Sequence, residues 1–211
     1  DPNNRWWRLT IELTEALCEA GREKWLTSFT DFGDAFDALS YMRTPERLCM
    51  DLIEHREAVT AAAQWITELW LKLYGELLQI FRRYGQDGTC GWLAIWAPGT
   101  TYPLQCDFSC MVSPRDFDEL IKPLLQRLAE TLEFPTYHWD GTGALQHEKS
   151  LLSMPQLRVI QWVPGAGKPE PARWVELLRR IVAAGKKVHI WATPQELMEL
   201  VEHVPYQSLF V

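Results

Sequence analysis

Three short apolar runs in the second half of the chain share one pattern. Residues 136–141 (TYHWDG), 159–165 (VIQWVPG) and 188–194 (VHIWATP) are rich in β-branched or aromatic residues, reach a Trp and end in turn residues. A helical spacing of apolar positions follows each run, which is typical of consecutive βα units in a parallel sheet. Parallel strands end at one shared edge, where ligands bind in such folds. We therefore expect the three strand ends to lie side by side and to form a pocket.

The spacing of apolar positions predicts helices and strands elsewhere as well. Amphipathic patterns predict a helix over residues 6–24, two short helices after Gly33, and a long helix over residues 57–84. Extended segments are expected in WLTSFTDF, ending near Asp31, in CGWLAIWAP up to Pro98, in TYPLQCDFSC up to Cys110, and in SLFV at residues 208–211.

Two helix starts carry clear capping chemistry. Ser113 precedes Pro114, with an acid three residues after the cap, and Thr193 precedes Pro194 in the same way. After Thr193 the acid is a Glu, which completes a capping box. This repetition favours a reiterated βα design.

The number of strands sets a limit on the fold. We count five or six strands, whereas a closed (β/α)8 barrel needs eight and roughly 250 residues. The predicted fold class is α/β: one domain over residues 1–211 that forms an incomplete TIM barrel, without its first βα units and its C-terminal end. The alternative is that dimerisation closes the sheet, because an uncovered last strand would expose backbone donors and apolar side chains.

Composition excludes several classes of function. The 211 residues contain 21 basic and 28 acidic side chains, a net charge of −7, which argues against a nucleic-acid-binding surface. No apolar run approaches the roughly 20 residues of a membrane span, and no signal-peptide pattern opens the chain. Five scattered cysteines without a CxxC pair suggest neither a disulfide scaffold nor a zinc ribbon. We expect a cytoplasmic protein with no membrane or nucleic-acid partner.

The strand ends supply the candidate catalytic residues. His138 and Asp140 are two residues apart, so on a strand they share one face, and both are suitable ligands for zinc or another divalent ion. Otherwise they make hydrogen bonds in the pocket mouth, or Asp140 caps the turn at Gly141. Asp107 is a possible carboxylate partner of His138, with Gln105 on its face of the strand and Cys106 on the other. The plainer interpretation makes Asp107 a loop acid.

A wider set of residues is expected to contact the substrate. Asp31 ends an early extended segment, although it also suits the turn at Gly33, and His147 either reaches the pocket or is solvated. His189 is expected to be packed within its strand. The predicted substrate-binding residues are Asp31, Gln105, Tyr137, Trp139, His147, Gln161, Trp162 and Trp191.

Four segments in order resemble the uroporphyrinogen decarboxylase superfamily. They are residues 30–52 (TDFGDAFDALSYMRTPERLCMDL), 105–125 (QCDFSCMVSPRDFDELIKPLL), 137–147 (YHWDGTGALQH) and 160–174 (IQWVPGAGKPEPARW). The resemblance implies a TIM barrel, matched over its middle and C-terminal parts. It also implies either decarboxylation of a tetrapyrrole or methyl transfer between a corrinoid protein, a thiol or a cofactor.

The methyltransferase branch of that superfamily carries a His-x-Cys zinc motif at a strand end and a distant Cys. His138 matches this His, Asp140 replaces the first Cys, and the second Cys would fall beyond Val211 or be absent. Carboxylate in place of thiolate weakens the case for thiol-activating zinc but still permits a divalent metal.

The decarboxylase branch needs no metal, and the Asp and arginines that it uses lie in the part that is expected to be missing. Acidic and aromatic strand ends favour methyl transfer at a pocket centred on His138, with a corrinoid as the partner cofactor. Porphyrinogen decarboxylation is the second hypothesis, and ligand binding without turnover is the third.

Overall fold

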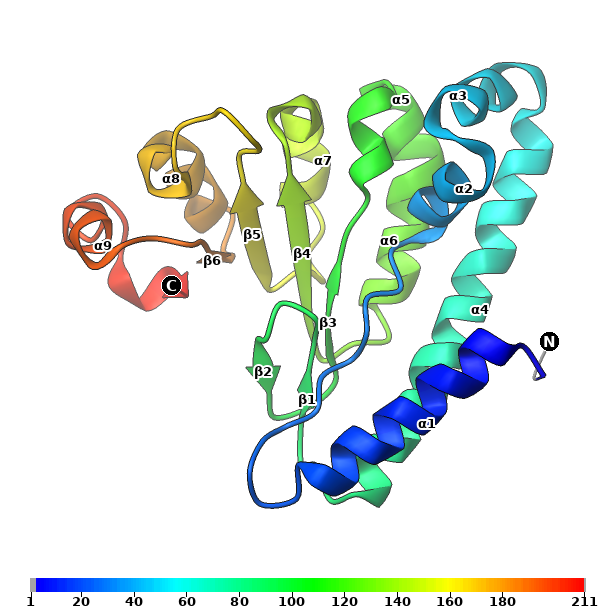
Figure 1. The fold of residues 1–211 in the computed structure, drawn as a ribbon. Helices are drawn as coiled ribbons and strands as arrows, with labels where there is room; N and C mark the ends of the chain where they lie inside the picture. The colour runs from blue at the N-terminus through cyan, green and yellow to red at the C-terminus, as the bar shows by residue number, and fades with distance from the viewer. Residues whose placement is uncertain (1–2, 211) are drawn as a thin grey trace.

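The second half of the chain forms a parallel sheet of five strands in sequence order. β3 (Thr101–Leu104), β4 (Phe134–Asp140), β5 (Val159–Val163), β6 (Lys187–His189) and β7 (Leu209–Phe210) pair in that order. The computed structural model describes residues 3–210 (Figure 1). The predicted α/β class is confirmed, as is the parallel, sequential order of the three Trp-containing runs. Of the expected last strand, Val211 lies outside the described residues.

Helices between the strands cover one face of this sheet. α6 (Lys122–Ala129), α7 (Glu148–Leu152) and α8 (Val175–Ala183) lie along that face, and α9 (Pro194–Leu200) follows β6 (Figure 1). The expected caps are confirmed: Ser113 accepts a hydrogen bond from the backbone N–H of Asp116 at the start of α5 (Pro114–Asp116), and Thr193 forms a capping box at α9. Within the described residues, no helix is long and apolar enough to cross a bilayer.

The alternation of side chains along β4 and β5 corrects part of the predicted pocket. Tyr137, Trp139 and Trp162 are buried on the helix-covered face, and the two indole rings meet edge to face at 5.4 Å. The Trp139 indole N–H donates to the backbone oxygen of Ala144, at 3.1 Å. Because side chains alternate along a strand, these three point away from His138. The expectation that they contact a ligand beside His138 is wrong.

The first half of the chain supplies four helices: α1 (Arg5–Ala20), α2 (Ala35–Arg43), α3 (Pro45–Glu54) and α4 (Arg56–Arg83). All four were predicted. The segment WLTSFTDF is extended but joins no sheet, although the Phe29 N–H donates to the backbone oxygen of Cys90 at 2.8 Å, so its assignment as a strand is wrong. Its Phe29 instead packs among Tyr74, Phe81 and Tyr102. Aromatic burial, rather than a hydrogen-bonded ladder, holds this segment in place.

Two other predicted strands are shorter than expected. CGWLAIWAP forms a small antiparallel hairpin of β1 (Thr89–Cys90) and β2 (Trp96–Ala97), turning through Ala94 at a φ of 57°. The hairpin loop lies against β3, where the Trp92 indole N–H donates to the backbone oxygen of Pro103 at 3.1 Å. TYPLQCDFSC is extended only to Leu104, and a 3-10 helix, η1 (Asp107–Met111), replaces its second half.

The buried tryptophans of the helix-covered face give a stability test. We expect Trp162→Ala to lower the free energy of unfolding by about 3–5 kcal/mol, because it opens a cavity in a fully buried layer. Trp191→Ala is the matched control: Trp191 also ends an apolar run but is 61% exposed, so we expect a change within about 0.5 kcal/mol. Urea denaturation of both variants measures the difference. Equal losses would contradict this assignment of faces.

Candidate functional site

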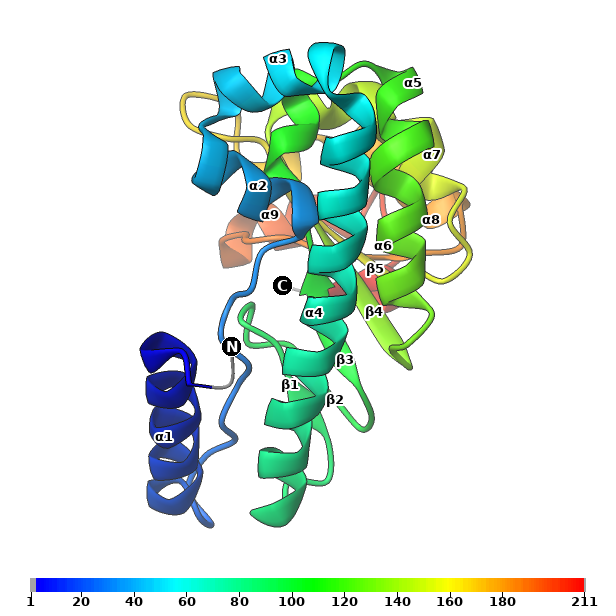
Figure 2. The ribbon, with the colours of Figure 1, turned by 90° about the vertical axis from the view of Figure 1, so that its right-hand side faces the viewer.

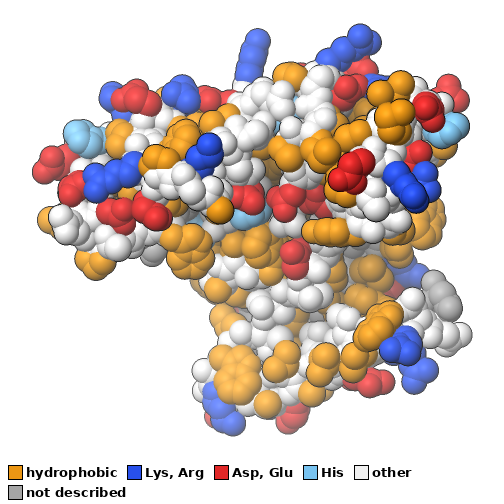
Figure 3. Space-filling model, turned by 45° about the horizontal axis from the view of Figure 1, so that its top comes forward, with side chains coloured by type: hydrophobic (Ala, Val, Ile, Leu, Met, Phe, Trp, Pro, Cys, Tyr) orange, Lys and Arg blue, Asp and Glu red, His pale blue; other side chains and the backbone are white. Residues whose placement is uncertain are grey.

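Three of the predicted residues come together at the carboxyl end of the parallel strands. Asp107 arrives on η1, directly after β3, while His138 and Asp140 project from the end of β4. One ligand atom from each lies within 4.8 Å of the others. In Figure 3, acidic side chains and a histidine gather in a hollow in the middle of this face. Asp107 therefore lies near His138, although no direct hydrogen bond or ion pair joins these two side chains, and their partnership stays a prediction.

The orientation of the His138 ring is set by the neighbouring strand. His138 and Gln161 are directly paired in the parallel register, and His138 Nδ1 is hydrogen-bonded to Gln161 Oε1. An amide oxygen only accepts hydrogen bonds, so Nδ1 is the donor in this contact, and in the neutral imidazole Nε2 would then keep a free lone pair. The ring of Trp92 meets the imidazole edge to face at 5.1 Å. Gln161 is fully buried and contacts the His138 ring, so its role is to position that ring.

Several buried polar atoms around this cluster have no protein partner among the described residues. They are Asp140 Oδ1, Gln161 Nε2 and His189 Nδ1. Gln161 is paired in register with His138 on one side and His189 on the other, so the three form a row across β4, β5 and β6. Buried polar groups are nearly always satisfied in native proteins. The concentration of unsatisfied atoms on this face is what a site awaiting a polar ligand would present.

His189 was expected to be a packing residue, and it is indeed buried, but it belongs to this row. Aligning the three apolar runs on their tryptophans does not place His189 level with Gln161, so the sequence analysis did not include it among the site residues. The register places Gln161 opposite His189, so the next residue, Ile190, lies level with Trp162 and is buried on the same face of the sheet. Trp191 comes one position later and is exposed. The sequence signal that could have revealed this row is the occurrence of two histidines and a glutamine at corresponding positions of three consecutive strands. Burial and the nearby His138 lower the pKa of His189, which favours its neutral form.

The charges near the cluster are mainly negative. Burial raises the pKa of Asp107, His138 lowers it, and Asp140 and Asp31 raise it further. Carboxylates crowded in this way favour either protons or a bound cation. The arrangement is therefore suited to a divalent ion or to acid/base chemistry.

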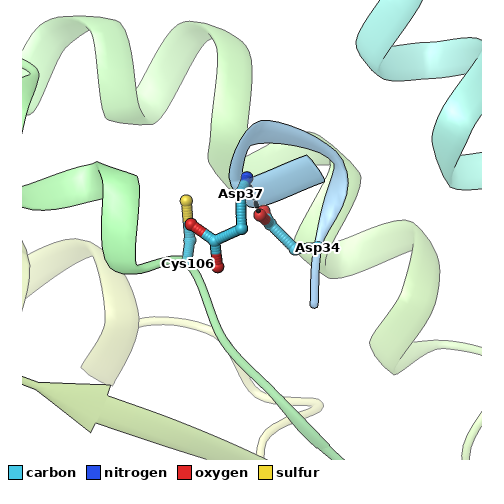
Figure 4. Close-up of side chains that lie close together, drawn as sticks. All are labelled: Asp34, Asp37 and Cys106. Carbon is cyan, nitrogen blue, oxygen red and sulfur yellow. Dashed lines mark hydrogen bonds between the residues drawn. The ribbon is translucent and has the colours of Figure 1, made fainter. Parts of the chain in front are cut away.

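A second cluster, of Asp34, Asp37 and Cys106, is buried beside the first (Figure 4). Asp34 caps α2 by accepting from the backbone N–H of Asp37, at 2.7 Å. The Asp37 carboxylate in turn accepts from the backbone N–H groups of Asp107, at 3.1 Å, and Phe108, at 2.8 Å. These contacts cap η1, which is why the chain leaves the extended conformation before Asp107. Asp107 is thus placed by a cap and not by strand alternation, contrary to the expectation.

The chemistry of this second cluster is that of a structural cap. Burial raises the pKa of Asp34 well above its usual range, and the neighbouring Asp37 adds to the effect. Burial also raises the pKa of Asp37, to about 6, and holds the pKa of Cys106 well above that of a free thiol. A protonated thiol is a poor metal ligand, and the Asp37 oxygens are already engaged. Sequence reasoning missed Asp34 and Asp37, although Asp-x-x-Asp at a helix start is a capping signal.

The remaining predicted residues have other surroundings. Asp31 Oδ1 accepts from the backbone N–H of Gly33 at 2.8 Å, so the turn-capping alternative holds. The buried His147 donates from Nε2 to the backbone oxygen of Ser109 at 2.8 Å and stacks on Phe117, so it ties two turns together. Gln105 is buried next to Cys106, and the exposed Trp191 lines a shallow surface groove near α9.

A cavity of about 710 Å³ lies between α1 and α4. Trp7, Ile11 and Phe32 give it apolar walls, and Asp31 lies on its lining. Asp31 is also one of the carboxylates that raise the pKa of Asp107. None of Asp107, His138 and Asp140 lies on the lining of this cavity.

Comparisons with family models, with curated proteins and with solved structures found no match to this chain.

The acidic cap gives a prediction with a defined sign. The folded-state pKa of Asp34 is raised well above its usual range and that of Asp37 to about 6, so their contribution to stability is fully present below about pH 4. The Asp37 part is lost as the pH rises through about 6, and the Asp34 part is lost as the pH rises through its own raised pKa. Asp34→Asn retains a side-chain oxygen that can cap α2 but removes the titratable carboxyl group. We expect its stability relative to the wild type to rise as the pH increases above about 4, until the pH passes the raised pKa of Asp34.

Asp34→Ala is the matched control, because it removes the titration and the cap together. We expect it to lower the free energy of unfolding by about 1–2 kcal/mol relative to Asp34→Asn at every pH. Urea denaturation across the pH range measures both variants. A constant difference between Asp34→Asn and the wild type would show that Asp34 is not a buried titrating acid.

Proposed function

We propose that the chain is a metal-assisted enzyme of the uroporphyrinogen decarboxylase superfamily that transfers a methyl group involving a thiol or a corrinoid. His138, Asp107 and Asp140 would hold a divalent ion such as zinc. The observation that carries this proposal is the grouping of a His138 ring nitrogen with two carboxylates, together with the contact that holds His138 Nδ1 against Gln161. Metal-binding histidines are typically oriented by such a bond from their other ring nitrogen.

The donor set fits a catalytic metal site. Zinc binds imidazole nitrogen and carboxylate oxygen at about 2.0–2.2 Å, so tetrahedral ligand atoms are roughly 3.4 Å apart. The three atoms here lie within 4.8 Å of one another, so small side-chain rotations bring them into range. The unpartnered Asp140 Oδ1 would gain a partner. Three protein ligands leave one position for substrate, as in catalytic zinc sites.

The fold supports the finer assignment to a TIM barrel. Five parallel strands in sequence order, with helices on one face, correspond to part of a (β/α)8 barrel. On that reading, His138 and Gln161 face the barrel interior, and the cluster lies at the carboxyl end, where barrel enzymes carry their active sites. A cytoplasmic setting remains our expectation, and all five cysteines are free thiols.

A metal bound here would lower the pKa of a coordinated thiol or water and so supply a nucleophile. The chain's own residues have separate tasks. Gln161 keeps the His138 lone pair directed at the site, and the cap formed by Asp37 fixes the position of Asp107. A corrinoid carried by a partner protein would supply or accept the methyl group.

Porphyrinogen decarboxylation ranks second because the substrate carboxylates need cationic side chains. The groups that shift the pKa of Asp107 are one histidine and two carboxylates, with no Lys or Arg among them. An acidic mouth would repel a polycarboxylate. Ligand binding without turnover is the remaining alternative.

The metal site is tested by titrating the purified protein with Zn²⁺ and Co²⁺. We expect one ion per chain, and we expect His138→Ala to abolish stoichiometric binding because it removes the only nitrogen ligand. His203→Ala, at an exposed surface histidine, should bind like the wild type. Gln161→Leu should weaken binding roughly 10- to 100-fold, because it frees the imidazole to rotate. Since the pKa of Asp107 is raised, binding should weaken on acidification before an ordinary carboxylate would protonate.

Mass spectrometry for metal content and Co²⁺ absorption spectra are the measurements. A wild type that retains no ion and gives no Co²⁺ spectrum at millimolar metal would sink the metal hypothesis. Equal binding by the His138 and His203 variants would place the ion elsewhere.

Methyl transfer is tested with methylcobalamin and a small thiol such as dithiothreitol. In this reaction the thiolate takes the methyl group, the carbon–cobalt bond breaks, and the absorbance of methylcobalamin declines. We expect turnover that depends on added metal and falls at least about 100-fold in His138→Ala. Decarboxylation of uroporphyrinogen without metal would favour the second candidate. Binding of methylcobalamin without turnover would favour the non-catalytic alternative.

A further inference from the structure

The side-chain amide of Gln161 lies between two histidines. Gln161 is fully buried, and the strand register pairs it with His138 on β4 and with His189 on β6. This row lies on the face of the sheet turned away from α7 and α8, which Figure 2 shows on the opposite side of the molecule from α2. An amide has one accepting end and one donating end, so its orientation decides what it offers to each histidine.

The accepting end of this amide is used, and its donating end is not. Gln161 Oε1 contacts His138 Nδ1, whereas Gln161 Nε2 is buried without a protein partner among the described residues. Buried N–H groups without an acceptor are rare in native proteins, because each one loses its hydrogen bonds to water. An acceptor for Gln161 Nε2 is therefore needed on the side of the amide that faces away from His138.

His189 has a matching unpartnered atom. It is 6% exposed, and its Nδ1 is buried with no hydrogen-bond partner in the part of the chain that the structure describes. Burial lowers the pKa of His189 and the charge of His138 lowers it further, so the two rings are near each other. A neutral imidazole keeps one unprotonated nitrogen that accepts a hydrogen bond. Neighbouring strands are about 4.8 Å apart, which brings paired side chains on one face into contact.

We propose that His189 is a positioning residue for His138 and acts through Gln161. Gln161 Nε2 donates to His189 Nδ1, which turns Gln161 Oε1 toward His138 and keeps the proton of His138 on Nδ1. His189 then carries its own proton on Nε2. Two of the three unpartnered atoms around the cluster satisfy each other in this way, and Asp140 Oδ1 is left for a bound cation.

The opposite orientation of the amide would remove the cation ligand. Gln161 Nε2 would then donate to His138 Nδ1, so His138 would carry its proton on Nε2 and would present no lone pair to the two carboxylates. An accepting His189 Nδ1 disfavours this orientation, because it would face Gln161 Oε1, which is also an acceptor. Each imidazole has an aromatic neighbour that limits its rotation: Trp92 meets His138 at 5.1 Å, and Trp191 meets His189 at 5.4 Å.

Nitrogen-15 NMR of the metal-free protein at about pH 8, where histidines are neutral, tests the proposal. We expect His138 to be protonated on Nδ1 and His189 on Nε2. His189→Leu removes the acceptor, so the ratio of the Nδ1-protonated to the Nε2-protonated form of His138 should fall at least about fivefold. His189→Asn should keep the wild-type ratio, because the Asn side-chain oxygen takes the place of Nδ1.

Val188→Ala is the matched control for a loss of stability. Val188 is fully buried one residue before His189, on the helix-covered face, so this variant opens a cavity without touching the row. We expect it to leave the His138 tautomer unchanged. A wild-type His189 protonated on Nδ1, or a His138 ratio that a folded His189→Leu variant leaves unchanged, overturns the proposal. The wild-type tautomers decide the question even if His189→Leu does not fold.

A second readout rests on the proposed metal site. His189→Leu should weaken Zn²⁺ binding about two- to fivefold, because a smaller fraction of His138 then has its lone pair on Nε2. His189→Asn should bind Zn²⁺ like the wild type, and equal weakening in both variants would contradict a role through Gln161. A wild type that binds no Zn²⁺ would count against the proposed function alone, since the tautomers of the metal-free protein test the role of His189 separately.

Discussion

The candidate site depends on the register between β4 and β5, which places Gln161 directly opposite His138. A slip of one residue would turn every side chain of a strand to the other face. The register is held from the opposite side of the sheet, where Trp139 and Trp162 are paired in the same ladder and fully buried under the helices. Burial of these two indoles stabilises the fold by several kcal/mol. Because neighbouring side chains alternate between faces, it also fixes His138 and Gln161 on the other face of the sheet. The apolar core thereby determines where the His138 lone pair points.

The third member of the cluster is placed by a different interaction. Asp107 owes its position to the Asp37 carboxylate, which arrives from α2, about 70 positions earlier in the chain, and caps η1. Burying Asp34 and Asp37 together carries a cost, seen in their raised pKa values. Such costly groups are retained where geometry matters more than stability. The first half of the chain therefore contributes to the site through this cap of η1.

The elements that follow from local patterns could be predicted from the sequence. The parallel order of β4, β5 and β6 and the caps at Ser113 and Thr193 rest on periodicity and short-range hydrogen bonds. The association of Asp107 with His138 also follows, because parallel strands share one edge. Features set by long-range contacts could not be predicted. The aromatic cluster around Phe29, the capping of η1 by Asp37, and the register that adds His189 to the row all depend on residues far apart in the chain.

The tautomer of His138 is the most direct test of this account, since both its orientation and its ability to bind a cation depend on the bond to Gln161. Nitrogen-15 NMR of the imidazoles distinguishes protonated from unprotonated ring nitrogens, and His147, which donates from Nε2 to Ser109, provides an internal reference of the opposite tautomer. The account predicts that His138 carries its proton on Nδ1 at neutral pH and that the Nε2 resonance shifts or broadens on addition of Zn²⁺ or Co²⁺. A His138 protonated on Nε2 and unaffected by either ion would contradict it.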